Sequence, residues 1–217
     1  MLPLLAFDLD GTLIDSAQDI TTALNSVFSQ YQKPQLTKNE VIPYIGNGPR
    51  QLILDVFAND KMSSQSQNEI YQQFVDHYHQ VMLETTSIYP GVVDFLKSYS
   101  GPIGVITNKP IHPTRKILQH LELNRLPWVE IYGADSLPEK KPSALPLKTL
   151  MKKANREPNT SIMIGDGIPD MESGQNAGAK IIAVSYGYSK LDILKKYQPN
   201  QILHQFADLP TLIQKMS

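Results

Sequence analysis

The sequence Asp8-Leu9-Asp10-Gly11-Thr12 directly follows the apolar run from Leu2 to Phe7. A short apolar run of this kind is typical of a buried strand, and open parallel sheets bind ligands at the carboxyl ends of their strands. Asp8 and Asp10 offer oxygen ligands for a hard cation, and an aspartate can also attack phosphorus to form an aspartyl phosphate. Gly11 lets backbone amides approach a phosphate closely. The stretch favours phosphoryl chemistry, and its alternative is a loop in which Asp10 caps a turn beside Gly11.

Three later groups of polar residues each follow another run that is typical of a strand. Thr107 and Asn108 offer a hydroxyl and an amide, which bind phosphate oxygens without adding charge. Lys141 offers a cation that balances both a phosphate and a crowded carboxylate. Asp166 and Asp170 add two carboxylates four residues apart. Taken singly, these residues are also typical of a strand-end turn, a solvated lysine and a helix cap.

The order of these groups resembles the four-motif signature of the haloacid dehalogenase superfamily, and the match extends over nearly the whole chain. Within that superfamily, four stretches are similar to bacterial phosphoglycolate phosphatases: Phe7 to Ser16, Tyr89 to Val92, Asp135 to Pro142 and Ser185 to Tyr188. One departure follows Pro142, where those phosphatases usually continue with histidine or aspartate and then proline, and this chain has Ser143-Ala144. The departure weakens the assignment to this subfamily more than it weakens the predicted phosphoryl chemistry.

Length and composition agree with an enzyme of this kind. The 217 residues and a hydrophobic content of 41% suffice for one large domain, or for a core with a smaller insertion. A formal charge of -1 gives no basic surface for nucleic acid, and the lack of cysteine excludes disulfides, cysteine nucleophiles and thiolate metal sites. No cationic signal region begins the chain, and no apolar stretch approaches the ~20 residues that cross a bilayer. We therefore expect a cytoplasmic protein that needs neither nucleic acid nor membrane, as a monomer or a homodimer.

Helical periodicity dominates the segment between the first and second motifs. Ser16 with Asp19 resembles a capping box, and Thr37 with Glu40 signals a second helix start. Gly46-Asn47-Gly48-Pro49 interrupts the pattern. Apolar residues recur at helical spacing in three segments: 20–31, 51–57 and 70–82. This segment has no convincing strand.

Predicted strands alternate with helical stretches after about residue 87. The strands lie near residues 102–106, 129–133, 161–165 and 180–184. Such alternation is typical of a parallel sheet with helices on both faces. We therefore predict an α/β core of residues 1–15 and 86–217 with a helical insertion at residues 16–85. The resemblance implies the same organisation: a doubly wound, Rossmann-like parallel sheet with a mobile helical cap over the active site.

The resemblance also implies a role for each acidic residue. Asp8 would be the nucleophile, and Asp10 the general acid that protonates the leaving group and then the base that activates water. Asp8, Asp10 and Asp166 would hold Mg²⁺, with the backbone carbonyl of Asp10 among the ligands. Asp170 would orient metal-bound waters or the lysine without binding the ion directly.

The same resemblance implies which residues hold the substrate. Thr107, Asn108 and the backbone near Gly11 would bind the phosphoryl oxygens, and Lys141 would compensate their charge. In the predicted cap, Arg50 adds a planar cation suited to a carboxylate or a second phosphate, so we place it in the substrate site. The alternative for Arg50 is an exposed residue that opens a helix.

Histidines contribute little to the prediction. His77 and His79 lie two residues apart on a predicted helix, so they do not share a face and make a poor metal pair. We expect the remaining three at the surface: His112, His120 and His204.

The prediction is a Mg²⁺-dependent phosphatase that hydrolyses a small phosphomonoester through an aspartyl phosphate, with 2-phosphoglycolate as the first candidate. Nucleoside monophosphates, pyrophosphate and sugar phosphates are alternative substrates, and a phosphomutase of the same fold is an alternative enzyme. A dehalogenase is disfavoured, because it needs neither a metal nor the second aspartate. Four intact motifs disfavour a catalytically silent binding module.

Overall fold

The computed structural model describes residues 1–60 and 63–216. Residues 61 and 62 of the predicted cap and residue 217 of the predicted core lie outside the described residues. The strands are β1 (Leu4–Phe7), β2 (Ile14–Asp15), β3 (Ser87–Ile88), β4 (Ile103–Ile106), β5 (Trp128–Tyr132), β6 (Ser161–Gly165), β7 (Lys180–Val184) and β8 (Gln201–Leu203). The α-helices are α1 (Ala17–Gln30), α2 (Lys38–Val41), α3 (Pro49–Val56), α4 (Ser64–Val81), α5 (Val92–Ser98), α6 (Ile111–His120), α7 (Leu145–Ala154), α8 (Ile168–Ala177), α9 (Leu191–Leu194) and α10 (Leu209–Lys215). The short 3₁₀ helices are η1 (Ile42–Tyr44), η2 (Leu123–Arg125), η3 (Pro158–Thr160), η4 (Lys195–Tyr197) and η5 (Phe206–Asp208).

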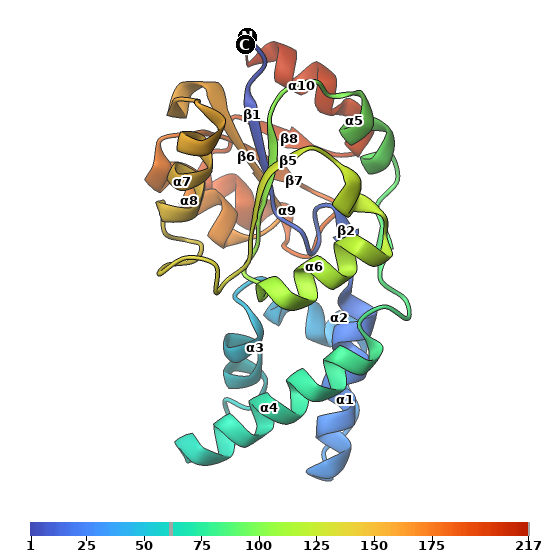
Figure 1. Ribbon diagram of the computed structural model, residues 1–217. Helices are drawn as coiled ribbons and strands as arrows, with labels where there is room; N and C mark the ends of the chain where they lie inside the picture. The colour runs from blue at the N-terminus through green and yellow to red at the C-terminus, as the bar shows by residue number, and fades with distance from the viewer. Residues whose placement is uncertain (61–62, 217) are drawn as a thin grey trace.

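Six strands form one parallel sheet in the order β5-β4-β1-β6-β7-β8 (Figure 1). β1 lies in the middle, where Phe7 is in register with Val105 of β4 on one side and Ile164 of β6 on the other. The carboxyl ends of β1, β4 and β6 therefore meet at one end of the sheet. The predicted parallel sheet is confirmed.

Helices cover both faces of this sheet, which explains why β1 is apolar at every position. Leu5 and Phe7 pack in a cluster with residues of α5, α6 and α10. Leu4 and Ala6 face the opposite way, into a cluster with α7 and α8. Since successive side chains of a strand point to opposite faces, a strand buried on both faces must be apolar throughout.

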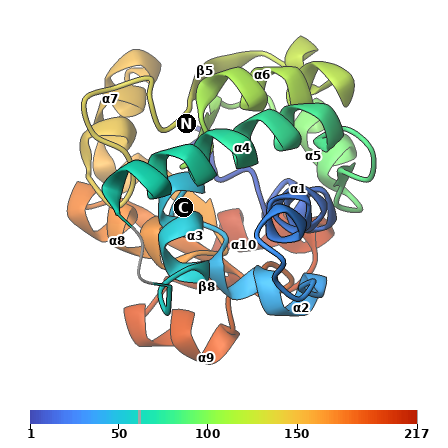
Figure 2. The same ribbon diagram turned by 90° about the horizontal axis from the view of Figure 1, so that it is seen from below.

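The helices α1 to α4, which we call the helical block, lie beyond the carboxyl ends of the strands (Figure 1). The block has an apolar cluster of its own, in which Leu24 of α1, Leu52 of α3 and Phe74 of α4 are buried. Seen from below, α4 crosses the molecule and α1 lies beside one of its ends (Figure 2). Residues 16–60 and 63–85 contain no strand. Among all the described residues, no helix is long and apolar enough to span a membrane.

Two adjacent connections join the helical block to the sheet. β2 pairs with β3 in an antiparallel ribbon, so the chain enters and leaves the block side by side. Asp19 reinforces this junction, because its carboxylate accepts hydrogen bonds from the backbone amides of Thr85 and Thr86. The predicted capping box of Ser16 and Asp19 is therefore wrong. Ser16 Oγ donates to Asp10 instead, and Asp19 binds Thr85 and Thr86. Thr37 and Glu40 do form a capping box, at the start of α2.

Candidate active site

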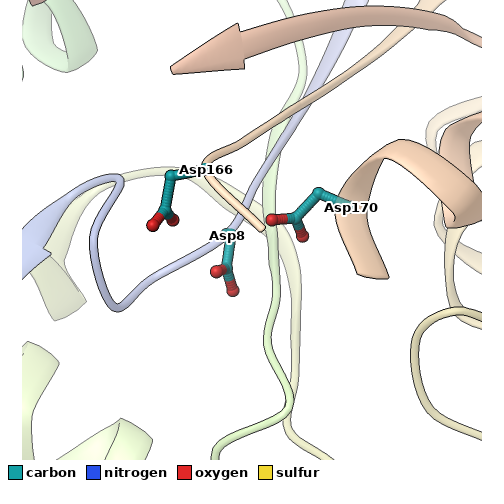
Figure 3. A group of neighbouring side chains, drawn as sticks. All are labelled: Asp8, Asp166 and Asp170. Atoms are coloured by element: carbon teal, nitrogen blue, oxygen red, sulfur yellow. The ribbon is translucent and has the colours of Figure 1, made fainter. Parts of the chain in front are cut away.

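Three carboxylates meet where β1 and β6 end. Asp8 follows β1, Asp166 follows β6, and Asp170 lies in the first turn of α8. One carboxylate oxygen from each lies within 4.8 Å of the others, and all three side chains are buried (Figure 3). Asp170 also caps α8, because its Oδ2 accepts a hydrogen bond from the amide of Gly167 at 2.9 Å.

Lys141 lies between two of these carboxylates. Its Nζ is 2.7 Å from Asp8 Oδ1 and 2.5 Å from Asp170 Oδ1, and its side chain is 2% exposed. Burial lowers the pKa of Lys141, but the charges of Asp170 and Asp8 outweigh it and raise that pKa above its ordinary value. The lysine is therefore a permanent cation within the group.

One lysine does not neutralise three carboxylates. Burial, followed by the nearby Asp170 charge, raises the pKa of Asp8 from 3.8 to about 7. Burial and the charges of Asp8 and Asp170 likewise raise the pKa of Asp166 well above its ordinary value. A divalent cation relieves this repulsion, and clustered carboxylate oxygens are the donors that Mg²⁺ prefers. The donor set fits the metal that the sequence implies.

The side chain of Asp10 lies outside this group of carboxylates. Its Oδ2 is 2.9 Å from Lys109 Nζ, and its Oδ1 accepts a hydrogen bond from Ser16 Oγ at 2.5 Å. Its side chain is therefore engaged outside the group of Asp8, Asp166 and Asp170. Ligation of Mg²⁺ through the backbone carbonyl of Asp10 stays a prediction. This separation suits a carboxylate that handles protons instead of binding the ion through its side chain.

Sequence reasoning missed Lys109, which directly follows Thr107-Asn108 after β4. Burial lowers the pKa of Lys109, but the charge of Asp10, followed by Tyr78, raises it above the ordinary value. Its ammonium group lies 4.8 Å from the centre of the Tyr78 ring in α4. Lys109 therefore contacts both the sheet end and the helical block, and its position in the second motif was the available signal.

Thr107 and Asn108 lie buried at the end of β4, as predicted. Thr107 Oγ1 accepts a hydrogen bond from the amide of Lys109 at 3.1 Å. The amide nitrogen of Asn108 donates to the carbonyls of Gly46 at 3.0 Å and Lys141 at 3.1 Å. Asn108 Oδ1 is buried without a hydrogen-bond partner. Asn108 thus joins the loop before α3 to the core.

Gly11 sits against the carboxylate of Asp166. Its φ is +85°, and a Cβ there would lie 2.3 Å from Asp166 Oδ2. The hydroxyl of Thr12 donates to Asp166 Oδ1 at 2.9 Å, and the amide of Tyr188 donates to Oδ2 at 2.7 Å. Thr12 and Tyr188 were not predicted to have a role, because their contacts with Asp166 span 154 and 22 residues of chain.

A cavity of about 170 Å³ separates the sheet end from the helical block. Asp8, Asp10 and Thr107 line it on the core side, and residues of α3 and α4 line it on the other side. Arg50 is not among the lining residues. Its guanidinium lies 4.3 Å from the centre of the Tyr71 ring and donates to Asn68 Oδ1 at 2.8 Å. The structure therefore does not bring Arg50 to the site, because partners on α4 hold it at the surface.

Comparisons with known proteins identify the family to which the chain belongs. The family model for haloacid dehalogenase-like hydrolases matches residues 5–184. A phosphoglycolate phosphatase of Psychrobacter arcticus is 33% identical, and the match covers 95% of this chain and 93% of the relative. Phosphoglycolate phosphatase 1 of Pseudomonas aeruginosa is 32% identical over 95% of this chain and 78% of the relative. The crystal structure of a predicted phosphoglycolate phosphatase from Haemophilus somnus superposes with a TM-score of 0.88 at 28% identity, covering 97% of each chain.

Proposed function

This chain is a phosphatase that belongs to the haloacid dehalogenase-like hydrolases, and we propose that it hydrolyses a small phosphomonoester with Mg²⁺ through an aspartyl phosphate. The observation that carries the proposal is the buried group of Asp8, Asp166 and Asp170 around Lys141. Its excess negative charge suits a divalent cation, and it borders a cavity large enough for a small organic phosphate.

Asp8 is the nucleophile in this proposal. Lys141 holds Oδ1 of Asp8, which orients the second carboxylate oxygen for attack on phosphorus. A bond then forms between that oxygen and phosphorus while the bond from phosphorus to the ester oxygen breaks. Asp8 and Asp166, with the backbone carbonyl of Asp10, would hold Mg²⁺, which when bound neutralises the attacking carboxylate and the transferring phosphoryl group. Asp170 would orient Lys141, because its Oδ1 contacts the lysine and its Oδ2 accepts from the amide of Gly167.

Asp10 handles the protons. It gives a proton to the departing ester oxygen and then takes one from the water that hydrolyses the aspartyl phosphate. Ser16 and Lys109 hold its two carboxylate oxygens, so the group is fixed beside the nucleophile in a single orientation. Thr107 and the backbone at Asn108 and Gly11 are the proposed donors to the phosphoryl oxygens, because the Asn108 side-chain amide already donates to the carbonyls of Gly46 and Lys141.

The helical block is the proposed cap of the active site. It supplies the wall of the cavity opposite Asp8, and the core contacts it through Asn108 and through Lys140, whose Nζ donates to the carbonyl of Asn47 at 2.7 Å. A closed block would exclude bulk water from the phosphoryl site. The leaving group then lies against the block, so the block determines which esters are accepted.

Phosphate release from a panel of esters tests the proposal. The panel contains 2-phosphoglycolate, which the names of the relatives suggest, together with a nucleoside monophosphate, pyrophosphate and a sugar phosphate. We expect Mg²⁺-dependent release of phosphate from at least one ester and its loss in excess EDTA, with recovery when Mg²⁺ is restored. Hydrolysis that continues unchanged in EDTA would contradict the metal assignment.

A further inference from the structure

The cavity above Asp8 has an apolar wall. α3 and α4 contribute Leu52, Tyr71, Phe74 and Val75, and the preceding loop contributes Ile45. These side chains offer no charge to a ligand. The hydrogen-bonding groups on this side of the cavity are the hydroxyls of Tyr44, Tyr71 and Tyr78 and the imidazole of His79. A leaving group that enters this space therefore replaces its contacts with water mainly by contacts with apolar carbon atoms.

A cationic side chain is the strongest partner for a carboxylate, and among the described residues that line the cavity Lys109, His79 and His112 are those that can carry a positive charge. Lys109 is already paired with Asp10 at 2.9 Å. His79 and His112 face each other with ring centres 5.5 Å apart, but both side chains are exposed and so belong to the open end. Burial, followed by the charges of His112 and Lys116, lowers the pKa of His79.

The cavity is also large for the leaving group of 2-phosphoglycolate. Its volume of about 170 Å³ exceeds what a glycolate fills, and a carboxylate buried there without a partner loses its hydration at a high free-energy cost. Burial of a flat apolar ring has no comparable free-energy cost from lost hydration. It gains contact with Tyr71 and Phe74, and aromatic rings stack favourably on one another.

We propose that the preferred substrate is a phosphomonoester whose leaving alcohol carries an apolar ring, which occupies the cavity between α3, α4 and the sheet end. The inference rests on the proposed phosphatase function, and it names the substrate class of the same site. The ring lies against Tyr71 while the phosphoryl group lies at Asp8. Arg50 packs on the Tyr71 ring, which restrains the position of that ring.

Benzyl phosphate and ethyl phosphate provide a matched test, because their leaving alcohols have similar acidity and differ in the ring. Both are assayed by phosphate release with Mg²⁺ at neutral pH, beside 2-phosphoglycolate. We expect kcat/KM for benzyl phosphate to exceed that for ethyl phosphate by ~10-fold or more, since the ring buries apolar surface. We expect it also to exceed that for 2-phosphoglycolate.

Variants of α4 test the contact itself. Tyr71→Ala should lower the ratio of the benzyl to the ethyl kcat/KM by about 3-fold or more, because it removes a ring that stacks on the substrate. Tyr71→Phe should keep the ratio. Gln72→Ala is the matched control, since this neighbouring side chain is exposed and bonds only Asp76 within α4 among the contacts seen.

Two sets of outcomes separate the inference from the proposed function. Equal efficiency with benzyl and ethyl phosphate, a higher efficiency with 2-phosphoglycolate, or an unchanged ratio in Tyr71→Ala each overturns the inference while phosphatase activity stands. Failure to release phosphate from any ester overturns the proposed function, and the inference falls with it.

Discussion

Mg²⁺ binding should keep the carboxylate of Asp8 ionised. Its pKa is raised from 3.8 to about 7, so between these values the folded state binds more protons than the unfolded state. The free energy of unfolding of the metal-free protein should therefore fall as pH rises through this range. Mg²⁺ binds the ionised carboxylate, so it should raise Tm more at about pH 8 than at about pH 5.5. Scanning calorimetry with and without Mg²⁺ measures the rise in Tm at each pH. An equal rise at the two pH values would contradict the raised pKa of Asp8.

Gly11 is the residue where a single methyl group should damage the metal site. A Cβ at Gly11 would overlap the carboxylate of Asp166, whereas at Gly178 the nearest atom would be 3.7 Å away. Both glycines have positive φ, +85° and +72°, so alanine strains the backbone at both. Gly178→Ala should lose about 1 to 2 kcal/mol of stability from backbone strain, and Gly11→Ala should lose more because its Cβ also overlaps Asp166. Only Gly11→Ala should weaken Mg²⁺ binding, by ~10-fold or more. Titration calorimetry measures the Mg²⁺ affinity of each variant. Similar affinities would show that a Cβ at Gly11 does not disturb the carboxylate of Asp166.

The residues of the site were predictable to the extent that a motif contains them. Asp8, Lys141 and Asp166 meet because they follow strands or loops at one end of a parallel sheet. Lys109 and Thr12 were not predicted as site residues, because their roles depend on which side chain from a distant segment packs beside them. Local sequence does not contain that information.

At the scale of elements, the loop before α3 connects the helical block to the core. Lys140 reaches the carbonyl of Asn47, and Asn108 reaches that of Gly46. Lys140→Gln should loosen this loop and speed hydrogen exchange of the peptide over residues 44–50. The exposed Lys152 of α7 provides the control Lys152→Gln, which should leave that peptide unchanged. The same exchange in both variants would show that Lys140 does not hold the loop.

Most elements follow from periodicity, and the exceptions have physical causes. The predicted strands at 102–106 and 129–133 are β4 and β5, shifted by about one residue at their ends. β8 was not predicted, because it is only three residues long and begins with the polar Gln201; its pairing with β7 creates it. β2 and β3 have two residues each, so they exist only as a pair.

Across the whole molecule, the charged and the apolar side chains of the site come from different parts of the chain. The sheet end collects charge around Asp8, and the helical block presents apolar side chains to it. Arg50 illustrates what sequence cannot supply at this scale. Its residue type suits a carboxylate, but the packing of α3 on α4 turns it toward Asn68 and Tyr71. The boundaries of the proposed cap, residues 16 and 85, stay a prediction.

The central claim is that Asp8 attacks phosphorus, and Asp8→Asn tests it most directly. The amide is nearly isosteric but is not a competent nucleophile, and it also removes a metal ligand. The matched control is Asp192→Asn, because this exposed carboxylate lies on α9 and pairs weakly with Lys195 at 3.5 Å. Phosphate release by the folded variants, with Mg²⁺ and the best ester of the panel, should fall by about 10⁴-fold or more in Asp8→Asn and stay at the wild-type rate in Asp192→Asn. If Asp8→Asn retains a tenth of the wild-type rate, Asp8 is not the nucleophile.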